Sequence, residues 1–175
     1  AVLSLFFAAA EIDLSGDWRL SGMNETGAPV ECPIAVPGGV HHALYKAKLI
    51  DDPFWGCNET NVQWIGYNDW TIEREFDVSE EFLASEEIIL RAEDVDCFAE
   101  IFVNGRKIGE TCDRFLRWQF DVKPDLRVGR NVIRGVFRSA IRRGDELAAA
   151  YRRRANSSSS PSVKRLPRWS STRQC

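Results

Sequence analysis

Hydrophobic and polar residues alternate along the middle of the chain with the two-residue period of a β-strand. The clearest case runs from Trp70 to Val78, where every second residue is apolar except Arg74 and the residues between them are all polar. Successive side chains of a strand point to opposite faces of a sheet. The pattern therefore predicts a strand with one buried face and one solvated face.

Other short segments rich in β-branched and aromatic residues predict further strands. They are residues 87–91, 98–103, 106–111, 118–122 and 131–137, together with the alternating Cys32, Ile34 and Val36. Asn104-Gly105 separates two of these segments, and this dipeptide suits a type I′ turn because both of its residues accept a positive φ. Residues 98–111 therefore predict a β-hairpin.

One short helix is predicted over residues 40–49. Leu44 and Lys48 stand four residues apart, as do Tyr45 and Leu49, which places each pair on one side of a helix. Many short strands, regular turns and a single helix indicate an all-β fold, an antiparallel β-sandwich.

The first ten residues, AVLSLFFAAA, combine a short apolar run with three small residues. Small residues after an apolar run are typical of a signal-peptidase site, so residues 1–10 predict a signal-peptide remnant and a secreted, periplasmic or lysosomal protein. The alternative is a first β-strand, which the same residue types favour. The run is too short to span a bilayer, which takes about 20 apolar residues.

The other end of the chain changes character after residue 143. Residues 144–175 contain three consecutive arginines, four consecutive serines and two prolines, without an apolar period. Such composition is typical of a linker or a disordered tail. We therefore expect a β-sandwich domain over residues 11–143, followed by a basic Ser/Arg-rich linker or truncated tail.

Length and charge narrow the function classes. The chain has 175 residues, whereas a (β/α)₈ barrel needs about 250. The net charge of −3 divides into −13 over residues 1–129 and +10 over residues 130–175. The acidic first part argues against a nucleic-acid partner, and no segment is apolar enough for a membrane partner. An interaction module that uses the basic tail remains a third alternative.

The sequence offers no metal, cofactor or nucleophile motif. There is no Cys-x-x-Cys or His-x-x-x-His pair, and His41 and His42 are adjacent, so on a helix they point in different directions. A Gly-x-Ser-x-Gly elbow and a phosphate-binding loop are also missing. We predict neither a metal site nor a bound cofactor.

Asn-Glu pairs occur twice, as Asn24-Glu25 and Asn58-Glu59. Many retaining barrel glycosidases place Asn before the acid/base Glu, but the chain is too short for that barrel, so we interpret neither pair as catalytic. Thr follows each pair, which makes Asn24 and Asn58 N-glycosylation sequons. Asn156 begins a third sequon.

Aromatic residues, amides and acids are concentrated between Leu49 and Trp70. Aromatic rings stack on the apolar faces of sugars, while amides and carboxylates bind hydroxyl groups. This segment predicts a sugar-binding site, with the candidates Trp55, Asn58, Glu59 and Trp64. The alternative is a loop whose Trp residues fill the core.

A series of ordered segments resembles the N-terminal domain of β-mannosidases of glycoside hydrolase family 2. They are Leu14-Ser15-Gly16-Asp17-Trp18, Pro37-Gly38-Gly39-Val40-His41, residues 49–56, Asn58-Glu59, residues 62–66, Asp69-Trp70-Thr71, residues 98–105, residues 117–122 and Phe137-Arg138-Ser139. The likeness covers residues 14–140. Many segments in the family's order and spacing make the resemblance specific.

The resemblance implies a jelly-roll, galactose-binding-like sandwich at the head of a longer enzyme that removes terminal non-reducing β-D-mannose with retention. In the family a (β/α)₈ barrel carries both catalytic glutamates, so this chain would hold no catalytic residue, and β-mannoside oligosaccharides would bind through the barrel that it lacks. Asn58 best matches an Asn that approaches the sugar, and Trp55 and Glu59 flank it. An Asn58 that contacts sugar cannot also carry a glycan.

The alternative function is a stand-alone carbohydrate-binding sandwich without enzyme activity. In the family a Gly-Trp-Asp-Trp segment follows this domain shortly after the point where the chain stops at Cys175. The sequence beyond Cys175 therefore distinguishes the two functions.

Five cysteines leave at least one without a partner in the chain. In a hairpin closed by Asn104-Gly105, Cys97 lies directly opposite Cys112. Opposed residues have Cα atoms about 4.5–5.5 Å apart, which suits a disulfide. We predict a Cys97–Cys112 disulfide, with two reduced thiols as the alternative; a single β-bulge would shift the register and separate the pair.

Overall fold

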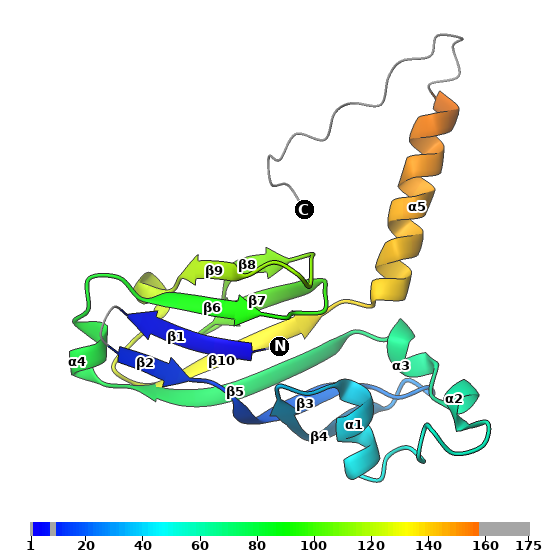
Figure 1. The fold of residues 1–175 in the computed structure, drawn as a ribbon, viewed down its shortest axis with the longest axis horizontal. Helices are drawn as coiled ribbons and strands as arrows, with labels where there is room; N and C mark the ends of the chain where they lie inside the picture. The colour runs from blue at the N-terminus through cyan, green and yellow to red at the C-terminus, as the bar shows by residue number, and fades with distance from the viewer. Residues whose placement is uncertain (1, 8–9, 158–175) are drawn as a thin grey trace.

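The computed structural model describes residues 2–7 and 10–157, which form two antiparallel sheets packed face to face (Figure 1). Across the larger sheet the strands are β4 (Pro29–Val36), β3 (Gly16–Met23), β5 (Trp70–Val78), β10 (Gly129–Phe137), β7 (Ala99–Val103) and β8 (Arg106–Thr111). Across the smaller sheet they are β2 (Ala10–Asp13), β1 (Val2–Phe7), β6 (Ile89–Glu93) and β9 (Trp118–Asp121). The predicted antiparallel β-sandwich is confirmed.

The described part of the chain contains more helical segments than the single helix expected. They are α1 (Val40–Lys46), α2 (Asn58–Asn61), α3 (Trp64–Tyr67), α4 (Glu80–Leu83), the 3-10 turn η1 (Lys123–Asp125) and α5 (Ala140–Ser157). Three of them, α1 to α3, lie between β4 and β5. Only α1 was expected, because a helix of four residues is too short to show a helical period in sequence.

The core lies between the two sheets. Alternate residues of β5 are buried as the sequence pattern predicts, and only Arg74 of that set stays partly exposed. Leu5 of β1 pairs with Leu90 of β6, and both side chains are fully buried. A void of about 10 Å³ is lined from both sheets, including Leu3 of β1 and Ile133 of β10, so the sheets are in close contact.

The N-terminal apolar run is part of this core. Residues 2–7 form β1, which pairs with both β2 and β6, and Leu3, Ser4 and Leu5 are buried. This is the strand interpretation of the segment, so the sandwich begins before the expected boundary at residue 11. Residues 8–9, within the small-residue run expected at a signal-peptidase site, lie outside the described residues.

The expected tail without regular structure is wrong for residues 144–157, which belong to α5. Ala and Arg make up half of this segment, and both favour helix. Ser139 precedes the helix and its Oγ accepts a hydrogen bond from Arg142 N at 3.1 Å, as an N-cap does. Asn156 and Ser157 of the third sequon belong to α5, whereas its Ser158, like the rest of residues 158–175, lies outside the described residues.

The predicted hairpin is confirmed at its turn. Asn104 and Gly105 have φ values of 49° and 85°, as a type I′ turn requires. A register shift follows between Ile101 and Phe102. β8 therefore contains one residue more than β7 at this point, and every later pair is shifted by one position.

That bulge separates the two cysteines expected to form a disulfide. Beyond it, Ala99 pairs with Thr111, so where the ladder ends the two strands are offset by one residue from the predicted register. Cys97 is a free thiol, and burial raises its pKa. The predicted Cys97–Cys112 disulfide is wrong, because one additional residue shifts the pairing by one position.

Candidate functional site

The connection between β4 and β5 holds all four residues predicted to bind sugar. In Figure 1 this connection, with α1 to α3, covers one end of the larger sheet. Trp55 precedes α2, Asn58 and Glu59 begin it, and Trp64 begins α3. Backbone N–H groups close successive turns here, including Asn58 N to the Trp55 carbonyl at 3.2 Å, so the connection is ordered without long elements.

Trp55, Asn58 and Glu59 lie on the solvent side of this connection. The Trp55 side chain is 77% exposed, and Glu59 is also exposed. Asn58 is half-buried, because its Nδ2 donates a hydrogen bond to the Asp52 carbonyl at 2.9 Å. Trp55 and Glu59 are therefore accessible to a bound partner, and Asn58 is partly so.

Trp64 does not join them. Its ring packs against Trp70, with centroids 6.1 Å apart and planes tilted by 44°. Trp70 is 4% exposed, and its Nε1 donates to the Ile65 carbonyl at 2.9 Å. A partly buried ring paired with a core ring serves packing. The alternative of a core-filling Trp therefore holds for Trp64.

A pocket of about 460 Å³ opens beside this connection, and no predicted sugar-binding residue lines it. Its floor is apolar and includes Ile72, Trp70 and Phe137. Its rim is polar and consists of His41, Asn68, Asp94, Asp96, Arg114 and Arg138. The rim comes from segments far apart in the sequence, so only the fold brings these side chains together.

Two titratable groups on the pocket lining, Asp94 and His41, have shifted pKa values. A hydrogen bond from Arg114 Nε, at 2.7 Å, lowers the pKa of Asp94, and burial lowers the pKa of His41. Each described carboxyl group with a shifted pKa is shifted downward; these groups are Asp13, Asp69, Asp94 and Glu100.

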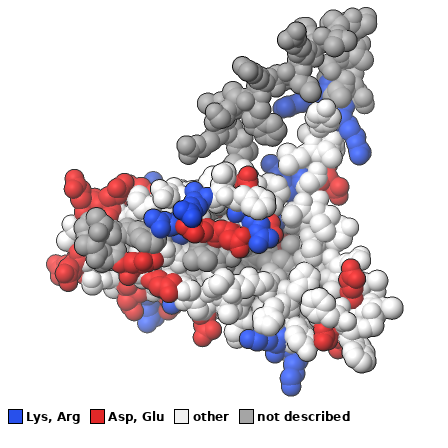
Figure 2. All heavy atoms as spheres, viewed as in Figure 1, with Lys and Arg blue, Asp and Glu red and all other residues white. Residues whose placement is uncertain are grey.

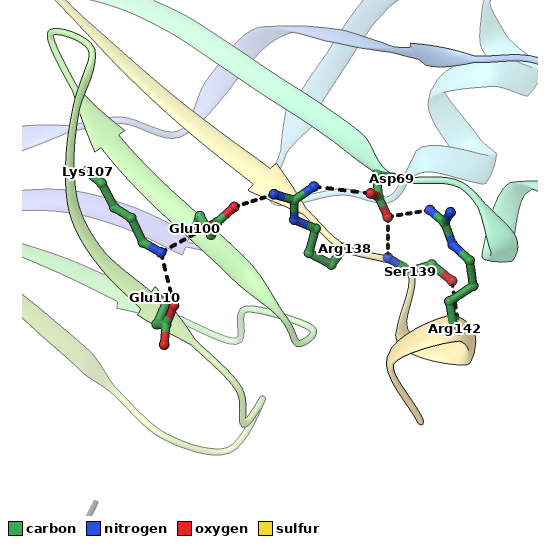
Figure 3. A network of polar contacts seen from close by, with 7 residues as sticks. All are labelled: Asp69, Glu100, Lys107, Glu110, Arg138, Ser139 and Arg142. Atoms are coloured by element: carbon green, nitrogen blue, oxygen red, sulfur yellow. Dashed lines mark hydrogen bonds and ion pairs between the residues drawn. The ribbon is translucent and has the colours of Figure 1, made fainter. Parts of the chain in front are cut away.

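Arg138, which also lines the pocket, belongs to a charged network centred on Asp69 (Figure 3). The Asp69 carboxylate accepts hydrogen bonds from Ser139 N at 2.8 Å, from Arg142 at 2.7 Å and from Arg138 at 3.3 Å. Burial alone would raise the pKa of Asp69, but these bonds and the Arg142 charge outweigh it and leave the pKa below its ordinary value. Asp69 therefore stays ionised.

Arg138 extends the network across the sheet. It also donates to Glu100 of β7 at 2.7 Å, and Glu100 accepts from Lys107 of β8 at 2.7 Å. Hydrogen bonds from Lys107 and then Arg138 lower the pKa of Glu100. The start of β5, the end of β10 and the first turn of α5 are thus held together by charge-assisted bonds. Asp69 and Arg138-Ser139 belong to the segments that carry the family resemblance, which was the available sequence signal.

Two further observations concern the described residues alone. No group of three or more His, Cys, Asp or Glu side chains among them is placed to hold a metal ion. None of the described helices is long and apolar enough to cross a membrane.

Residues 18–171 match the family model described as glycosyl hydrolase 2 galactose-binding domain-like. The chain belongs to this family. It is 33% identical to the β-mannosidase of Mus musculus over 155 residues, which is 86% of the chain and 17% of the mouse protein. It is 32% identical to a probable β-mannosidase of Caenorhabditis elegans over 145 residues, or 81% of the chain and 15% of that protein.

Solved structures agree with the sequence relatives. The β-D-mannosidase of Dictyoglomus thermophilum matches 79% of the chain with 38% identity and a TM-score of 0.74, using 17% of its own length. A β-glucuronidase of Bifidobacterium dentium matches with 22% identity and a TM-score of 0.54, which shows the shared fold alone. The chain matches the N-terminal domain of family 2 β-mannosidases and spans 15–17% of the length of these mannosidases.

Proposed function

We propose that this sandwich is the non-catalytic N-terminal domain of a β-mannosidase that releases terminal β-D-mannose from the non-reducing end of oligosaccharides. The observation that carries the proposal is the 38% identity and TM-score of 0.74 with the Dictyoglomus thermophilum β-D-mannosidase. A galactose-binding-like fold alone serves several glycosidases, so the sequence identity, rather than the fold, supports mannoside as the substrate class.

Exposed apolar side chains support a docking role for the α1–α3 connection. Figure 2 shows that the surface over this connection is largely uncharged. Its large exposed residues are Tyr45, Leu49, Phe54, Trp55 and Tyr67. Clustered apolar side chains on a surface are typical of an interaction site. In our proposal this surface packs against the catalytic part of the enzyme, and Asn58 borders the sugar pocket there.

The proposal is tested by comparing β-mannoside hydrolysis by the isolated chain with hydrolysis by the longer enzyme. The isolated 175 residues should not hydrolyse 4-nitrophenyl β-D-mannopyranoside, because they cannot hold the barrel that positions two carboxyl groups. The gene product that contains them should hydrolyse it, in preference to the β-glucuronide. Turnover by the isolated chain that survives repurification and is lost on mutating one of its carboxylates contradicts the proposal.

Asn58 is tested by substitution in the longer enzyme. Removing one neutral hydrogen bond to sugar changes kcat/KM by about 0.5–1.5 kcal/mol, or about 2- to 12-fold. Asn61→Ala is the matched control, since Asn61 is exposed at the far end of the same short helix. If Asn58→Ala and Asn61→Ala have equal kcat/KM, Asn58 only shapes the loop.

The location of the enzyme belongs to the same proposal. We infer a secreted or lysosomal protein, since oligosaccharide ends are present there and its sequons can be used there. Fractionation of cells expressing the natural gene tests this. Recovery of the enzyme in the cytosol alone contradicts it.

A further inference from the structure

The sequon Asn24-Glu25-Thr26 forms the turn of the β3–β4 hairpin. Asn24 N donates to the Ala28 carbonyl at 2.8 Å, and Gly27 N donates to the Asn24 carbonyl at 3.0 Å, which closes the turn. Residues 25–28 are exposed, and Gly27 takes a positive φ of 79°. The sequon therefore projects from the end of two strands that hold their own register through eight paired positions.

The Asn24 side chain is oriented by its oxygen. Asn24 Oδ1 accepts hydrogen bonds from Thr26 N at 3.0 Å, from Thr26 Oγ1 at 2.8 Å and from Ala28 N at 2.8 Å. Its Nδ2 makes no hydrogen bond among the described residues. The Thr26 hydroxyl of the sequon is thus hydrogen-bonded to the Asn24 side-chain oxygen. Attaching a sugar to Asn24 Nδ2 would break no hydrogen bond among the described residues.

The sequon at Asn58 has the opposite arrangement. Asn58 Nδ2 donates to the Asp52 carbonyl at 2.9 Å, so the amide nitrogen is engaged here, although Asn24 and Asn58 are both half-buried. Thr60 Oγ1 donates to the Cys57 carbonyl at 2.8 Å instead of to Asn58. Both residues lie in α2, where side chains two positions apart point to nearly opposite sides. A glycan here would have to leave from an amide already held by the loop.

We propose that Asn24 carries an N-linked glycan and that Asn58 does not. In the transfer, Asn24 Nδ2 bonds to C1 of an oligosaccharide held on a lipid diphosphate. The bond from C1 to the diphosphate oxygen breaks, the lipid diphosphate leaves, and the amide proton passes to a base of the transferase. The inference rests on the proposed secretory location and is independent of the proposed activity. It also leaves Asn58 available for contact with substrate.

The test uses the full chain secreted from a eukaryotic cell behind a heterologous signal sequence, with Asn156→Gln present throughout to remove the third sequon. Site occupancy is read from glycopeptide mass spectra and from the mobility shift on peptide-N-glycosidase treatment. We expect one glycan, located at Asn24. Asn58→Gln should keep the shift, and Asn24→Gln should abolish it.

Thr26→Ala and Thr26→Ser separate modification from folding. Thr26→Ala removes the hydroxyl but keeps the Asn24 bonds to the backbone N–H groups of residues 26 and 28, so the turn should survive without its glycan. Thr26→Ser should restore the glycan. The inference is overturned if Asn24 is unmodified in the secreted chain that carries only Asn156→Gln, or if Asn58 is occupied. A chain that is glycosylated at Asn24 but belongs to an enzyme inactive on β-mannosides overturns only the proposed function.

Discussion

Two tryptophans fifteen residues apart show how differently the strands and the connecting segment use the same side chain. Trp70 begins β5, is 4% exposed, and donates its Nε1 to a backbone carbonyl. Trp55 lies in the connection before α2 and is 77% exposed. Alternation along β5 turns the Trp70 ring to the buried side, where it packs beside Trp64, whereas the connection leaves the Trp55 ring exposed to solvent. The presence of a tryptophan therefore does not tell whether its ring is buried or exposed. The alternation of apolar and polar residues around it does.

The largest effect should come from Trp70→Ala. Removing a core ring leaves a cavity beside Trp64, and such changes cost about 3–5 kcal/mol of the free energy of unfolding. Urea denaturation followed by circular dichroism measures it. Trp55→Ala is the matched control and should change stability by less than about 0.5 kcal/mol. Equal losses from both variants would abolish the distinction between the two regions.

Gly22→Ala should cost about 1–3 kcal/mol, because a β-carbon on β3 would lie 2.4 Å from the buried Trp70 ring. The expected loss comes from a side-chain clash, so it depends on the ring. In a double-mutant cycle with Trp70→Leu, the penalty of Gly22→Ala should shrink. A penalty that stays the same in the cycle would place its cause in the backbone of β3.

Asp69→Asn tests the charged network that joins the sandwich to α5. Asp69 is about one-third exposed, so we expect a loss of about 1 kcal/mol, below that of a fully buried pair. Because the folded pKa is lowered, this contribution is complete above the unfolded pKa of about 3.9 and disappears as pH falls through the folded value.

The stability difference between wild type and Asp69→Asn should therefore be constant from about pH 7 to pH 5 and narrow below about pH 4. Glu75→Gln on the same strand is the control, since Glu75 is 61% exposed and pairs with Arg130 at 3.4 Å. It should cost less than about 0.5 kcal/mol. A difference for Asp69→Asn that persists unchanged at pH 2 contradicts the role of its charge.

Gly56→Ala should cost about 1 kcal/mol of the free energy of unfolding, no more than Asp69→Asn. Nothing lies within 4 Å of the added β-carbon, but φ is +60°, which disfavours side chains other than Asn and Asp. Gly56→Asn should recover much of the loss. Denaturant midpoints of the two variants decide it, and a fully stable Gly56→Ala would mean that the connection adjusts its backbone without cost.

The sequence predicts the regular part of this molecule well. β5 has the predicted bounds, and the Asn104-Gly105 turn has the predicted φ values, because alternation and turn chemistry are local properties. The disulfide prediction failed at a single bulge, which local pattern does not reveal. The N-terminal run was identified as a strand only by its pairing with β2 and β6, and residues 144–157, whose composition suggested a tail, belong to α5.

The candidate site is less predictable for a related reason. Asn58 and Trp55 were found by residue type, but Trp64 turned inward to a ring six positions away in sequence. The rim of the pocket joins His41, Asp94, Arg114 and Arg138, which only sheet topology brings together. Residue chemistry therefore identifies candidates within one segment, and convergence of distant segments requires the fold.

The anchored first turn of α5 has a mechanical consequence. The helix extends away from the sandwich for 18 residues, or about 27 Å at the rise of an α-helix (Figure 1). A tilt of about 10° at residue 140 would move its far end by about 5 Å over that length. Asp69 accepts hydrogen bonds from both Ser139 and Arg142, and so anchors the start of α5, about which any tilt of the helix would occur. The Asp69 carboxylate therefore helps to set the direction in which α5 leaves the sandwich.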